Sequence, residues 1–445
     1  MKNKLVNHQD NKFNAEVIPN LEGKYTVQYP ILQNATYTSL VNYATDLKSP
    51  IQRWYRYKEG YSTKLMKQLF KEYGVGKNDI ILDPFCGSGS TLIQAKINGS
   101  RSIGFEINPF SAFLSKAKTQ NYNEIDLSDF KNESDQLLSM NNINSDIEKP
   151  KLSTIDKLFS SDVLNYLLGL KSAIEEIKNT RVRDLFFLAW LSILEEASNY
   201  RKGGNGLKIR KGKRLPIKDL ESAEILFRKR IKDIEADLPF AIKISKDNTE
   251  PIIYEHTSLE MDKFVTPRSV KAVVFSPPYA NCFDYTEIYK VELWLGGFVK
   301  DYDDLKELRN RAVRSHLNGY DAESSNNSNI IAELNILTNA LGDIELWDKR
   351  IPKMINAYFS DMFVALDKIY TALRPDEFCA IIVSNSAYGG VIVPTDLLLT
   401  RYAETIGFKP LKIDVARFII TSSQQYRQTE QHKKYLRESI IHLRK

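Results

Sequence analysis

A short apolar run that stops at two prolines is the part of this sequence best suited to chemistry. Residues 273–279 read Val-Val-Phe-Ser-Pro-Pro-Tyr. The apolar part predicts a buried strand, and the prolines end it, because proline fixes φ and has no N–H to donate. The strand end then presents a hydroxyl, backbone carbonyls without sheet partners and an aromatic ring. Because ligands bind at this edge of open α/β sheets, Ser276, Pro277, Pro278 and Tyr279 are candidate site residues.

A second candidate site lies in residues 79–91, which read DIILDPFCGSGST. Residues 80–82 predict a short strand, and a helix starts at Thr91. The glycine-bearing turn between them lets a ligand approach the backbone closely. The candidate ligand-binding residues of this turn are Asp83, Pro84, Phe85, Gly87, Ser88 and Gly89.

An acidic residue follows the next predicted strand. Residues 101–105 predict a strand, and Glu106 and Ile107 come directly after it. Glu106 lies roughly 20 residues past the glycine turn, where Rossmann-type folds place the carboxylate that binds a ribose hydroxyl pair. The alternative is a purely structural turn with a surface carboxylate.

The remaining elements alternate between strands and helices, as in an α/β protein. Residues 62–73 predict an amphipathic helix that Ser62 can cap. Residues 1–30 are polar and predict an irregular arm, and 300–345 are polar and charged, with a flexible tip at 324–328. Further strands are predicted at 251–254, 378–383, 417–420 and 438–443, and helices at 287–295, 351–373 and 395–405. Ser258 lies just beyond the strand at 251–254.

Residues 121–247 follow a different, helical pattern. Helices are predicted over 162–178, 184–198 and 218–236, the second apolar nearly all round and therefore buried. Between the last two, residues 199–214 contain seven Lys or Arg and no acid, with glycines that predict a mobile loop. Lys208, Arg210, Lys211 and Lys213 either contact nucleic-acid phosphates or belong to a solvated charged loop.

Composition narrows the class of protein. The 445 residues carry a formal net charge of +6, which is compatible with nucleic acid. The three cysteines lie far apart, which argues against disulfides or a zinc site and fits a reducing cytosol. The first 14 residues lack the apolar core of a signal peptide, and no apolar run reaches the ~20 residues of a membrane span.

Together, DPFCGSGST, FEIN and SPPY resemble S-adenosylmethionine-dependent amino-methyltransferases, specifically bacterial site-specific DNA methyltransferases. Serine in SPPY is similar to the cytosine-N4 branch. The resemblance implies a Rossmann-like methyltransferase fold, with a mostly parallel seven-stranded sheet flanked by helices and interrupted by a helical insertion. It covers most of residues 33–445, except for stretches at 121–247 and 300–345.

The resemblance also assigns roles by position. The turn at 83–89 matches the loop that cradles the methionine part of the cofactor S-adenosylmethionine, and Glu106 matches the acid on its ribose. Ser258 lies near the strand end that contacts adenine, and residues 53–62 look like the segment that closes over the methionine end. Ser276, Pro277 and Tyr279 match the catalytic motif, and Phe283 and Tyr285 are candidate pocket-wall residues for the base.

The chemistry agrees with these residue types. An exocyclic amino nitrogen is a poor nucleophile because its lone pair is conjugated with the ring. Acceptors such as the Ser276 hydroxyl and the Pro277 carbonyl localise that lone pair by accepting the amino hydrogens, and the sulfonium is already an activated methyl donor. A target base in duplex DNA must be flipped out, and Tyr279 can stack on it, worth roughly 1–3 kcal/mol.

These expectations define four regions: an N-terminal arm at 1–32, a cofactor-binding half at 33–120, a helical insertion at 121–247, and a catalytic half at 248–445. The insertion or residues 300–345 must supply target recognition. The implied partners are double-stranded DNA and a restriction endonuclease acting on the same site, in a bacterial or archaeal cytoplasm, with no metal and no membrane. The alternatives are DNA adenine-N6 methylation, RNA methylation such as tRNA guanosine-N2, and a non-catalytic DNA-binding module.

Overall fold

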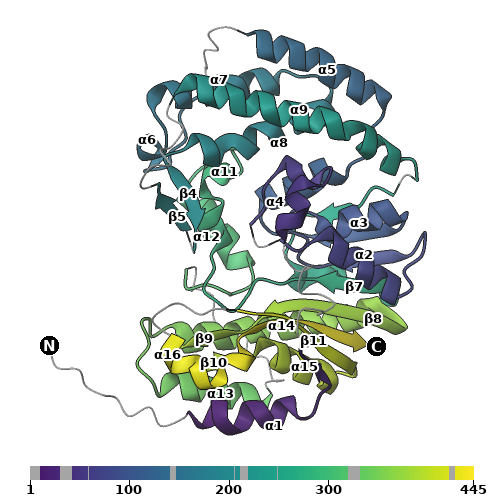
Figure 1. Cartoon of the computed structure of the whole chain (residues 1–445), viewed down its shortest axis with the longest axis vertical. Coiled ribbons are helices and arrows are strands. Elements are labelled where there is room, and N and C mark those ends of the chain that lie inside the picture. Colours follow the sequence, from purple (N-terminus) through teal and green to yellow (C-terminus); the bar gives the residue numbers. More distant parts are fainter. Residues whose placement is uncertain are drawn as a thin grey trace, which may run out of the picture.

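The computed structural model describes residues 11–30, 43–58, 60–140, 147–204, 206–210, 219–247, 249–318, 331–419 and 426–445. The predicted tip at 324–328 lies outside these ranges. Figure 1 shows a sheet-containing body, with the helices of the insertion gathered at one end of the molecule.

An eight-stranded sheet forms the centre of this body. Its order is β1-β11-β12-β8-β7-β2-β3-β6, and within it β12 alone runs antiparallel to both of its neighbours among the described strands. The bounds are β1 Val27–Gln28, β2 Ile80–Asp83, β3 Arg101–Phe105, β6 Ile252–Tyr254, β7 Val270–Phe275, β8 Leu373–Ser384, β11 Lys409–Phe418 and β12 Arg437–Arg444. The predicted Rossmann-like arrangement is confirmed, but the sheet has eight strands rather than seven.

The eighth strand comes from the N-terminal region that the sequence predicted to be irregular. Residues 13–22 form helices η1 (Phe13–Val17) and α1 (Ile18–Glu22), and β1 then pairs with β11. Buried Arg437 explains this docking, since its guanidinium donates to Glu22 Oε1 at 2.6 Å and to Asp396 Oδ2 at 2.8 Å. The polar residues that predicted an arm therefore make hydrogen bonds to the sheet.

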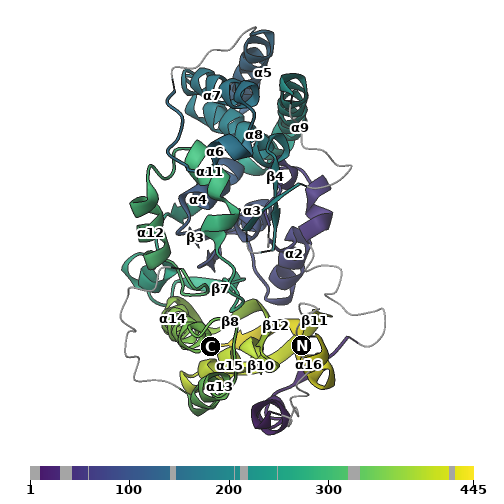
Figure 2. The ribbon, with the colours of Figure 1, turned by 90° about the vertical axis from the view of Figure 1, so that its left-hand side faces the viewer.

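Helices cover both faces of the sheet because its strand residues alternate. Val273 and Phe275 pack in the cluster that contains α14 (Ile351–Ala372) and α15 (Thr395–Thr405), whereas Ala272 and Val274 pack in the cluster that contains α2 (Thr63–Glu72). Strand side chains point to opposite faces in turn, so both sets are buried. Figure 2 shows the sheet between these helical layers.

The other helices complete the two faces and the insertion. Their bounds are α3 Ser90–Asn98, α4 Pro109–Thr119, α5 Glu124–Ser139, α6 Ile155–Leu158, α7 Ser161–Glu175, α8 Thr180–Ala197, α9 Leu220–Ser245, α10 Tyr285–Ile288, α11 Lys290–Leu295, α12 Tyr302–Arg311, α13 Ala332–Gly342 and α16 Tyr426–Thr429. Short strands β9 (Ser386–Tyr388) and β10 (Val391–Val393) pair with each other, as do β4 (Tyr200–Gly203) and β5 (Gly206–Ile209).

Candidate active site

The glycine turn lies between β2 and α3, and its backbone requires glycine. Gly87 has φ +51° and Gly89 has φ +87°, both in the left-handed region. A Cβ on Gly89 would lie 3.0 Å from Ser115 Oγ, and one on Gly87 would lie 3.3 Å from the Tyr57 ring. The turn therefore follows a tight path that has little room for side chains at these two positions.

Asp83, at the end of β2, makes hydrogen bonds that hold this turn in place. One carboxylate oxygen accepts from the Phe85 N–H at 3.0 Å, and the other accepts from the Tyr61 hydroxyl at 2.7 Å. Burial raises the pKa of Asp83 to about 6. Asp83 does not line the cavity described below, so its contacts are those of a residue that shapes the turn.

Glu106 joins the end of β3 to the same turn. Its carboxylate accepts from the Gly87 N–H at 2.9 Å and from the Asn108 N–H at 2.8 Å. Burial raises the pKa of Glu106 to about 7. The predicted acid and the predicted loop are thus in direct contact.

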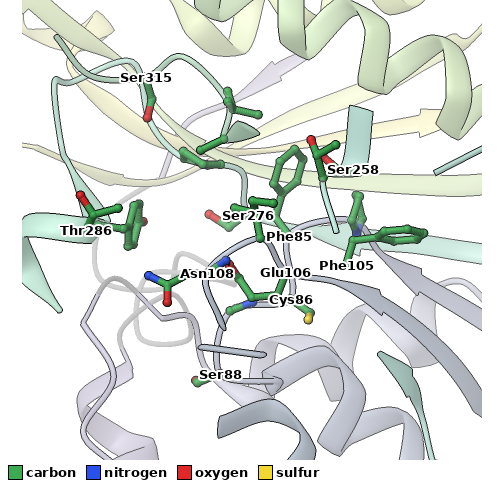
Figure 3. Close-up of a pocket in the computed structure, with 18 of the residues that line it drawn as sticks. Phe85, Cys86, Ser88, Phe105, Glu106, Asn108, Ser258, Ser276, Thr286 and Ser315 are labelled. Atoms are coloured by element: carbon green, nitrogen blue, oxygen red, sulfur yellow. The ribbon is translucent and has the colours of Figure 1, made fainter. Parts of the chain in front are cut away.

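A cavity opens above these residues, at the C-terminal edge of β2, β3 and β7 (Figure 3). The predicted residues that line it are Pro84, Phe85, Gly87, Ser88, Glu106, Ile107, Ser258, Ser276, Pro278 and Tyr285. The Ser258 hydroxyl is buried and has no hydrogen-bond partner among the described residues, so it is suited to a ligand. The loop, the acid and the end of β7 therefore share one cavity.

At the end of β7, the catalytic motif forms a short hydrogen-bonded chain. The Ser276 hydroxyl donates to the Tyr279 oxygen at 3.3 Å, and the Tyr279 hydroxyl donates to Glu438 Oε1 at 2.8 Å. Burial and the Glu438 charge raise the pKa of Tyr279, so its hydroxyl keeps its proton. Pro277 is buried between the two cavity-lining residues Ser276 and Pro278.

Two aromatic residues follow the motif. Tyr285 lines the cavity, and Phe283 packs edge-on against it, with ring centroids 4.8 Å apart. Lys58 Nζ lies 5.8 Å from the Phe283 ring centroid. Phe283 itself does not line the cavity and supports Tyr285 from the side.

The segment at 53–62 lies over one side of the cavity. Tyr57, Gly60 and Tyr61 line it, and the Tyr57 hydroxyl is 3.0 Å from Ser111 Oγ. Arg53 anchors the segment through an ion pair with Asp237 of α9, with Nη2 2.7 Å from Oδ1. This arrangement places the predicted closing segment beside the glycine turn.

Within the predicted mobile loop at 199–214, residues 200–203 and 206–209 instead form the two strands of a β-hairpin. In the pairing of β4 with β5, Tyr200 lies opposite Ile209 and Gly203 lies opposite Gly206. Gly204 takes a positive φ of +59° in the turn. The glycines therefore make a tight turn rather than a flexible loop. Lys208 is exposed, whereas Arg210 donates to the carbonyls of Tyr200 and Glu195. Lys211 and Lys213 lie outside the described residues.

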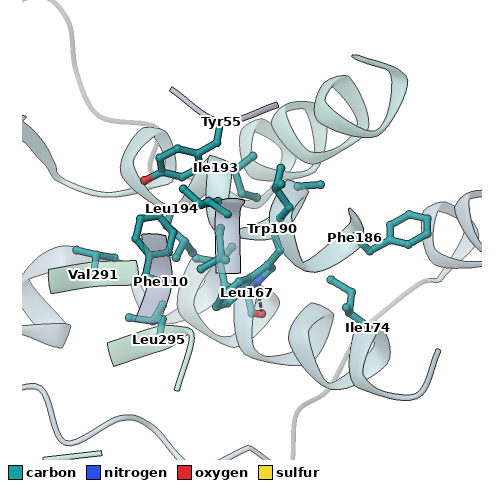
Figure 4. Packing of buried hydrophobic residues seen from close by; sticks show 14 of the residues in the cluster. Tyr55, Phe110, Leu167, Ile174, Phe186, Trp190, Ile193, Leu194, Val291 and Leu295 are labelled. Atoms are coloured by element: carbon teal, nitrogen blue, oxygen red, sulfur yellow. Dashed lines mark hydrogen bonds between the residues drawn. The ribbon is translucent and has the colours of Figure 1, made fainter. Parts of the chain in front are cut away.

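A buried ion pair fixes the hairpin to the catalytic half. Lys202 donates to Glu292 of α11 and to the Tyr55 oxygen, and the Tyr55 hydroxyl donates to Glu292 at 2.8 Å. The apolar core of the insertion continues into the same elements: Figure 4 shows Trp190 of α8 in one cluster with Phe110 and Val291. The hairpin is thus held beside α10, with which β5 is in contact.

A polar cleft lies between the hairpin and the segment at 55–58. It is lined by Tyr55, Arg56, Lys58, Ser192, Glu195, Glu196, Arg201, Lys202, Arg210 and Glu292. Arg56 and Arg201 are exposed at this cleft. Five basic side chains thus line this cleft together with three glutamates, and among the described residues Arg210 is the one of the predicted four that lines it.

Sequence reasoning missed several residues of the site. Glu438 reaches Tyr279 from β12, and Asn108, Ser315 and His316 line the cavity. Asn108 follows Glu106 closely in the sequence and could have been found from that position. Glu438 and His316 carry no local signal, because the sheet order and the 300–345 stretch bring them to the site.

Other kinds of site find little support in the described part of the chain. No group of three or more His, Cys, Asp or Glu in the described ranges is arranged to hold a metal ion. None of the helices that the structure describes is long and apolar enough to cross a membrane.

The sheet order, the glycine turn and the acid on the next strand define a Rossmann-like methyltransferase fold. Residues 10–117 match the family described as "DNA methylase". That match covers the glycine turn and Glu106 and ends before the motif at 276–279.

Curated relatives extend the similarity over most of the chain. Type II methyltransferase M.BsoBI of Geobacillus stearothermophilus is 28% identical over 424 residues, covering 84% of this chain and 82% of its own. Type II methyltransferase M.AvaI of Nostoc sp. is 25% identical, with the same coverage of both chains. A shorter match, 34% identical over 94 residues, covers 20% of this chain and 28% of the tRNA (guanine(10)-N2)-dimethyltransferase of Methanothermobacter thermautotrophicus. The resemblance to S-adenosylmethionine-dependent DNA amino-methyltransferases is confirmed, and S-adenosylmethionine is the cofactor that it supports.

Proposed function

We propose that this protein is a site-specific DNA methyltransferase that transfers a methyl group from S-adenosylmethionine to the N4 amino group of cytosine in duplex DNA. One observation carries the proposal: Ser276, at the end of β7, lines the same cavity as the glycine turn, whose Gly87 N–H donates to Glu106. The relatives support DNA amino-methylation in a restriction-modification system, and the choice of cytosine N4 rests on the site.

The cavity residues fit the proposed cofactor. Glu106 offers carboxylate acceptors for the ribose hydroxyls, and Ser258 offers an otherwise unpaired hydroxyl at the side proposed for adenine. The tight turn brings Gly87 and Ser88 to the cavity wall, where the methionine part can approach them closely. When bound, the cofactor supplies an activated methyl group at a sulfonium.

The hydrogen-bonded chain prepares Ser276 to receive an amino group. Because its hydroxyl proton points to Tyr279, the Ser276 oxygen presents its lone pairs elsewhere. The Ser276 oxygen and the Pro277 carbonyl then accept the two amino hydrogens of the extruded base, which localises the nitrogen lone pair. Glu438 keeps Tyr279 in place, so the orientation of Ser276 is set before the base arrives.

Aromatic and basic residues complete the proposed DNA site. Tyr285, backed by Phe283, offers a ring at the cavity wall on which an extruded base can stack, whereas Tyr279, predicted for this role, does not line the cavity. Arg201 and Lys208 on the hairpin are exposed beside this edge and are suited to backbone phosphates. The proposal for Lys211 and Lys213 is the same, and Arg210, tied to carbonyls, has a supporting role.

DNA adenine-N6 methylation remains the second candidate, because the matching family and the relatives do not separate it from cytosine N4. A tRNA substrate has only the short match over 94 residues in its favour. A non-catalytic DNA-binding role leaves the orientation of Ser276 without a purpose. The proposed setting is a bacterial or archaeal cytoplasm, with a restriction endonuclease that acts on the same DNA site.

The test is to incubate unmethylated genomic DNA with the protein and labelled S-adenosylmethionine, and to analyse the nucleosides by mass spectrometry. N4-methylcytosine is expected; N6-methyladenine or no product would overturn the proposal. Ser276→Ala should abolish turnover while cofactor affinity stays within about twofold, because the lost contact is to the base. Ser269→Ala, at the other end of β7, is the matched control and should retain full activity.

A separate measurement addresses the hairpin. Each phosphate contact contributes about −0.9 to the slope of log affinity against log salt. Replacing Arg201 and Lys208 by Gln should therefore flatten the slope by up to about 2 and weaken all DNA sequences alike. If the variant had the same slope as the unaltered protein, Arg201 and Lys208 would not contact DNA phosphates, and the hairpin would be an ordinary solvated surface.

A further inference from the structure

The chain between α12 and the 319–330 stretch forms the cavity wall opposite the glycine turn. Leu308 of α12, then Ala312, Val313, Ser315 and His316, line the same cavity as Ser276. Figure 3 shows Ser315 on the far side of the cavity from Ser88, with its hydroxyl directed inward. Residues from the polar stretch therefore reach the place where the base is proposed to bind.

This wall is held firmly on one side. The Arg314 N–H and Nε donate to Asp361 Oδ2 of α14 at 3.0 and 2.9 Å, and Arg314 Nη2 donates to Oδ1 at 2.6 Å. Both side chains are largely buried, so the paired guanidinium and carboxylate are shielded from water. Arg314 thus points away to α14, while its neighbours Val313 and Ser315 line the cavity.

Asp284 holds the other end of the wall. Its Oδ2 accepts from Asn318 Nδ2 at 3.0 Å and from Arg309 Nε at 3.1 Å, while Oδ1 accepts from the Thr286 N–H and hydroxyl. Asp284 lies five residues after Tyr279, immediately before α10. One carboxylate therefore ties the wall to the backbone that leaves the catalytic motif.

Between these anchors, His316 is held in one tautomer. The Asn318 N–H donates to His316 Nδ1 at 3.2 Å, so the proton of the neutral ring is on Nε2. No residue in the described part of the chain makes a hydrogen bond to Nε2, and the ring is only 6% exposed where it lines the cavity. Burial, opposed by the Asp284 charge and aided by Arg309, lowers the pKa of His316, which keeps the ring neutral.

We propose that His316 helps to bind the extruded base by donating its Nε2–H to the unprotonated ring nitrogen beside the amino group, which is N3 in cytosine. The idea rests on the proposed function and specifies the base-binding part of the same site. Cytosine presents an amino group beside an unprotonated ring nitrogen, which matches the Ser276 acceptor and the His316 donor. Adenine presents the same pair at N6 and N1, so this contact selects against thymine and does not by itself separate cytosine from adenine. Thymine carries an N–H at that ring position and would place two donors against each other. A neutral donor also leaves N3 unprotonated, so the amino lone pair is not drawn further into the ring.

Two variants separate the donor from the anchor. In His316→Asn, the side-chain amide oxygen can still accept from the Asn318 N–H, in the place of Nδ1, but the shorter side chain has no donor at the position of Nε2. The longer side chain of His316→Gln can place an N–H near Nε2. The substrate is a duplex that carries the sequence methylated by the unaltered protein, with either cytosine or 3-deazacytosine at the target. In 3-deazacytosine a C–H replaces N3 and the amino group remains.

For the unaltered protein and for His316→Gln, kcat/KM should fall about tenfold on replacing cytosine with 3-deazacytosine, which corresponds to one hydrogen bond. For His316→Asn, kcat/KM on cytosine should already be about tenfold lower, and 3-deazacytosine should lower it no further. The role of His316 would be overturned if 3-deazacytosine lowered kcat/KM of His316→Asn by a further tenfold. It would also be overturned if both variants lost the same factor in kcat/KM on cytosine. Cofactor affinity and melting temperature are measured for each protein, and they should match those of the unaltered protein.

Failure of the proposed function gives a different result. In that case the unaltered protein would yield no N4-methylcytosine on the cytosine duplex, whatever residue occupies position 316. Methylation of cytosine with additive losses would reject only the contact between His316 and N3.

Discussion

The carboxylate of Glu106 gives a prediction that sets stability against function. Burial raises its pKa from 4.5 to about 7, so the folded protein without cofactor holds a proton more tightly than the unfolded chain. The stabilising contribution of this proton is fully present below pH 4.5 and is lost as the pH rises through about 7. The difference sets an upper limit of about 3 kcal/mol, and because the side chain is only partly buried we expect roughly 1–2 kcal/mol at pH 8.

Glu106→Gln is the matching perturbation, because glutamine has the shape of the protonated acid and does not titrate. The free energy of unfolding, measured with urea, should be equal in the two proteins near pH 4, below the unfolded pKa of 4.5. At pH 8 it should be roughly 1–2 kcal/mol higher in the variant. Asp83, whose pKa is also raised, titrates in both proteins, so the difference between them isolates Glu106.

The same variant should bind S-adenosylmethionine about 10–100-fold more weakly at pH 8, because it loses a charged acceptor for the ribose hydroxyls. Calorimetric titration measures this affinity. Parallel stability curves of the two proteins from pH 4 to 8 would refute the buried-charge argument. If the variant bound the cofactor as tightly as the unaltered protein, Glu106 would not be a ligand of the ribose hydroxyls.

Three further predictions concern other buried groups. Burial lowers the pKa of Lys118 to about 7, and its Nζ has no hydrogen-bond partner in the described ranges. The stability that the neutral Lys118 amine contributes is therefore lost as the pH falls from 10.5 towards 7. Lys118→Met should raise the free energy of unfolding by about 2–4 kcal/mol at pH 7 and by less at pH 9.5. Gly104→Ala should cost about 1–3 kcal/mol in urea unfolding, since its Cβ would lie 2.8 Å from Leu92 Cδ1 and 2.9 Å from Cys86 Sγ, whereas Gly342→Ala, with open space around it, should cost nothing. Tyr279→Phe removes the acceptor of the Ser276 proton, and kcat should fall about tenfold with cofactor affinity unchanged; full activity would contradict the role of the hydrogen-bonded chain.

Local chemistry explains which parts of the fold could be predicted. The strand ends at Asp83, Glu106 and Ser276 were predictable because proline, glycine and β-branched residues act on their own backbone. The observed bounds of α15, Thr395–Thr405, equal the predicted range because its apolar spacing is regular. These signals also placed the glycine turn and the acid in contact, since parallel neighbouring strands end at one edge of the sheet.

Features that depend on distant residues were not predictable. The sequence around 200–209 predicts a mobile loop rather than the observed hairpin, because its lysines and glycines give no strand signal and its position depends on the contacts of Lys202 with Glu292. Strand β1 is two residues long and is held by pairing with β11. Glu438 and His316 reach the site through the sheet order and the Asp284 contacts, neither of which leaves a pattern in the neighbouring sequence.

The buried contact of Lys202 with Glu292 and Tyr55 has a consequence for exchanging the insertion between related proteins. Its three members come from the insertion, from α11 and from the segment before α2, so no single stretch of sequence contains them. A chimera that received residues 121–247 from a relative without a lysine at the position of Lys202 would leave Glu292 buried without its partner, at a cost of about 3–5 kcal/mol. A transplant of the insertion into such a chimera therefore has to carry positions 55 and 292 along with the hairpin.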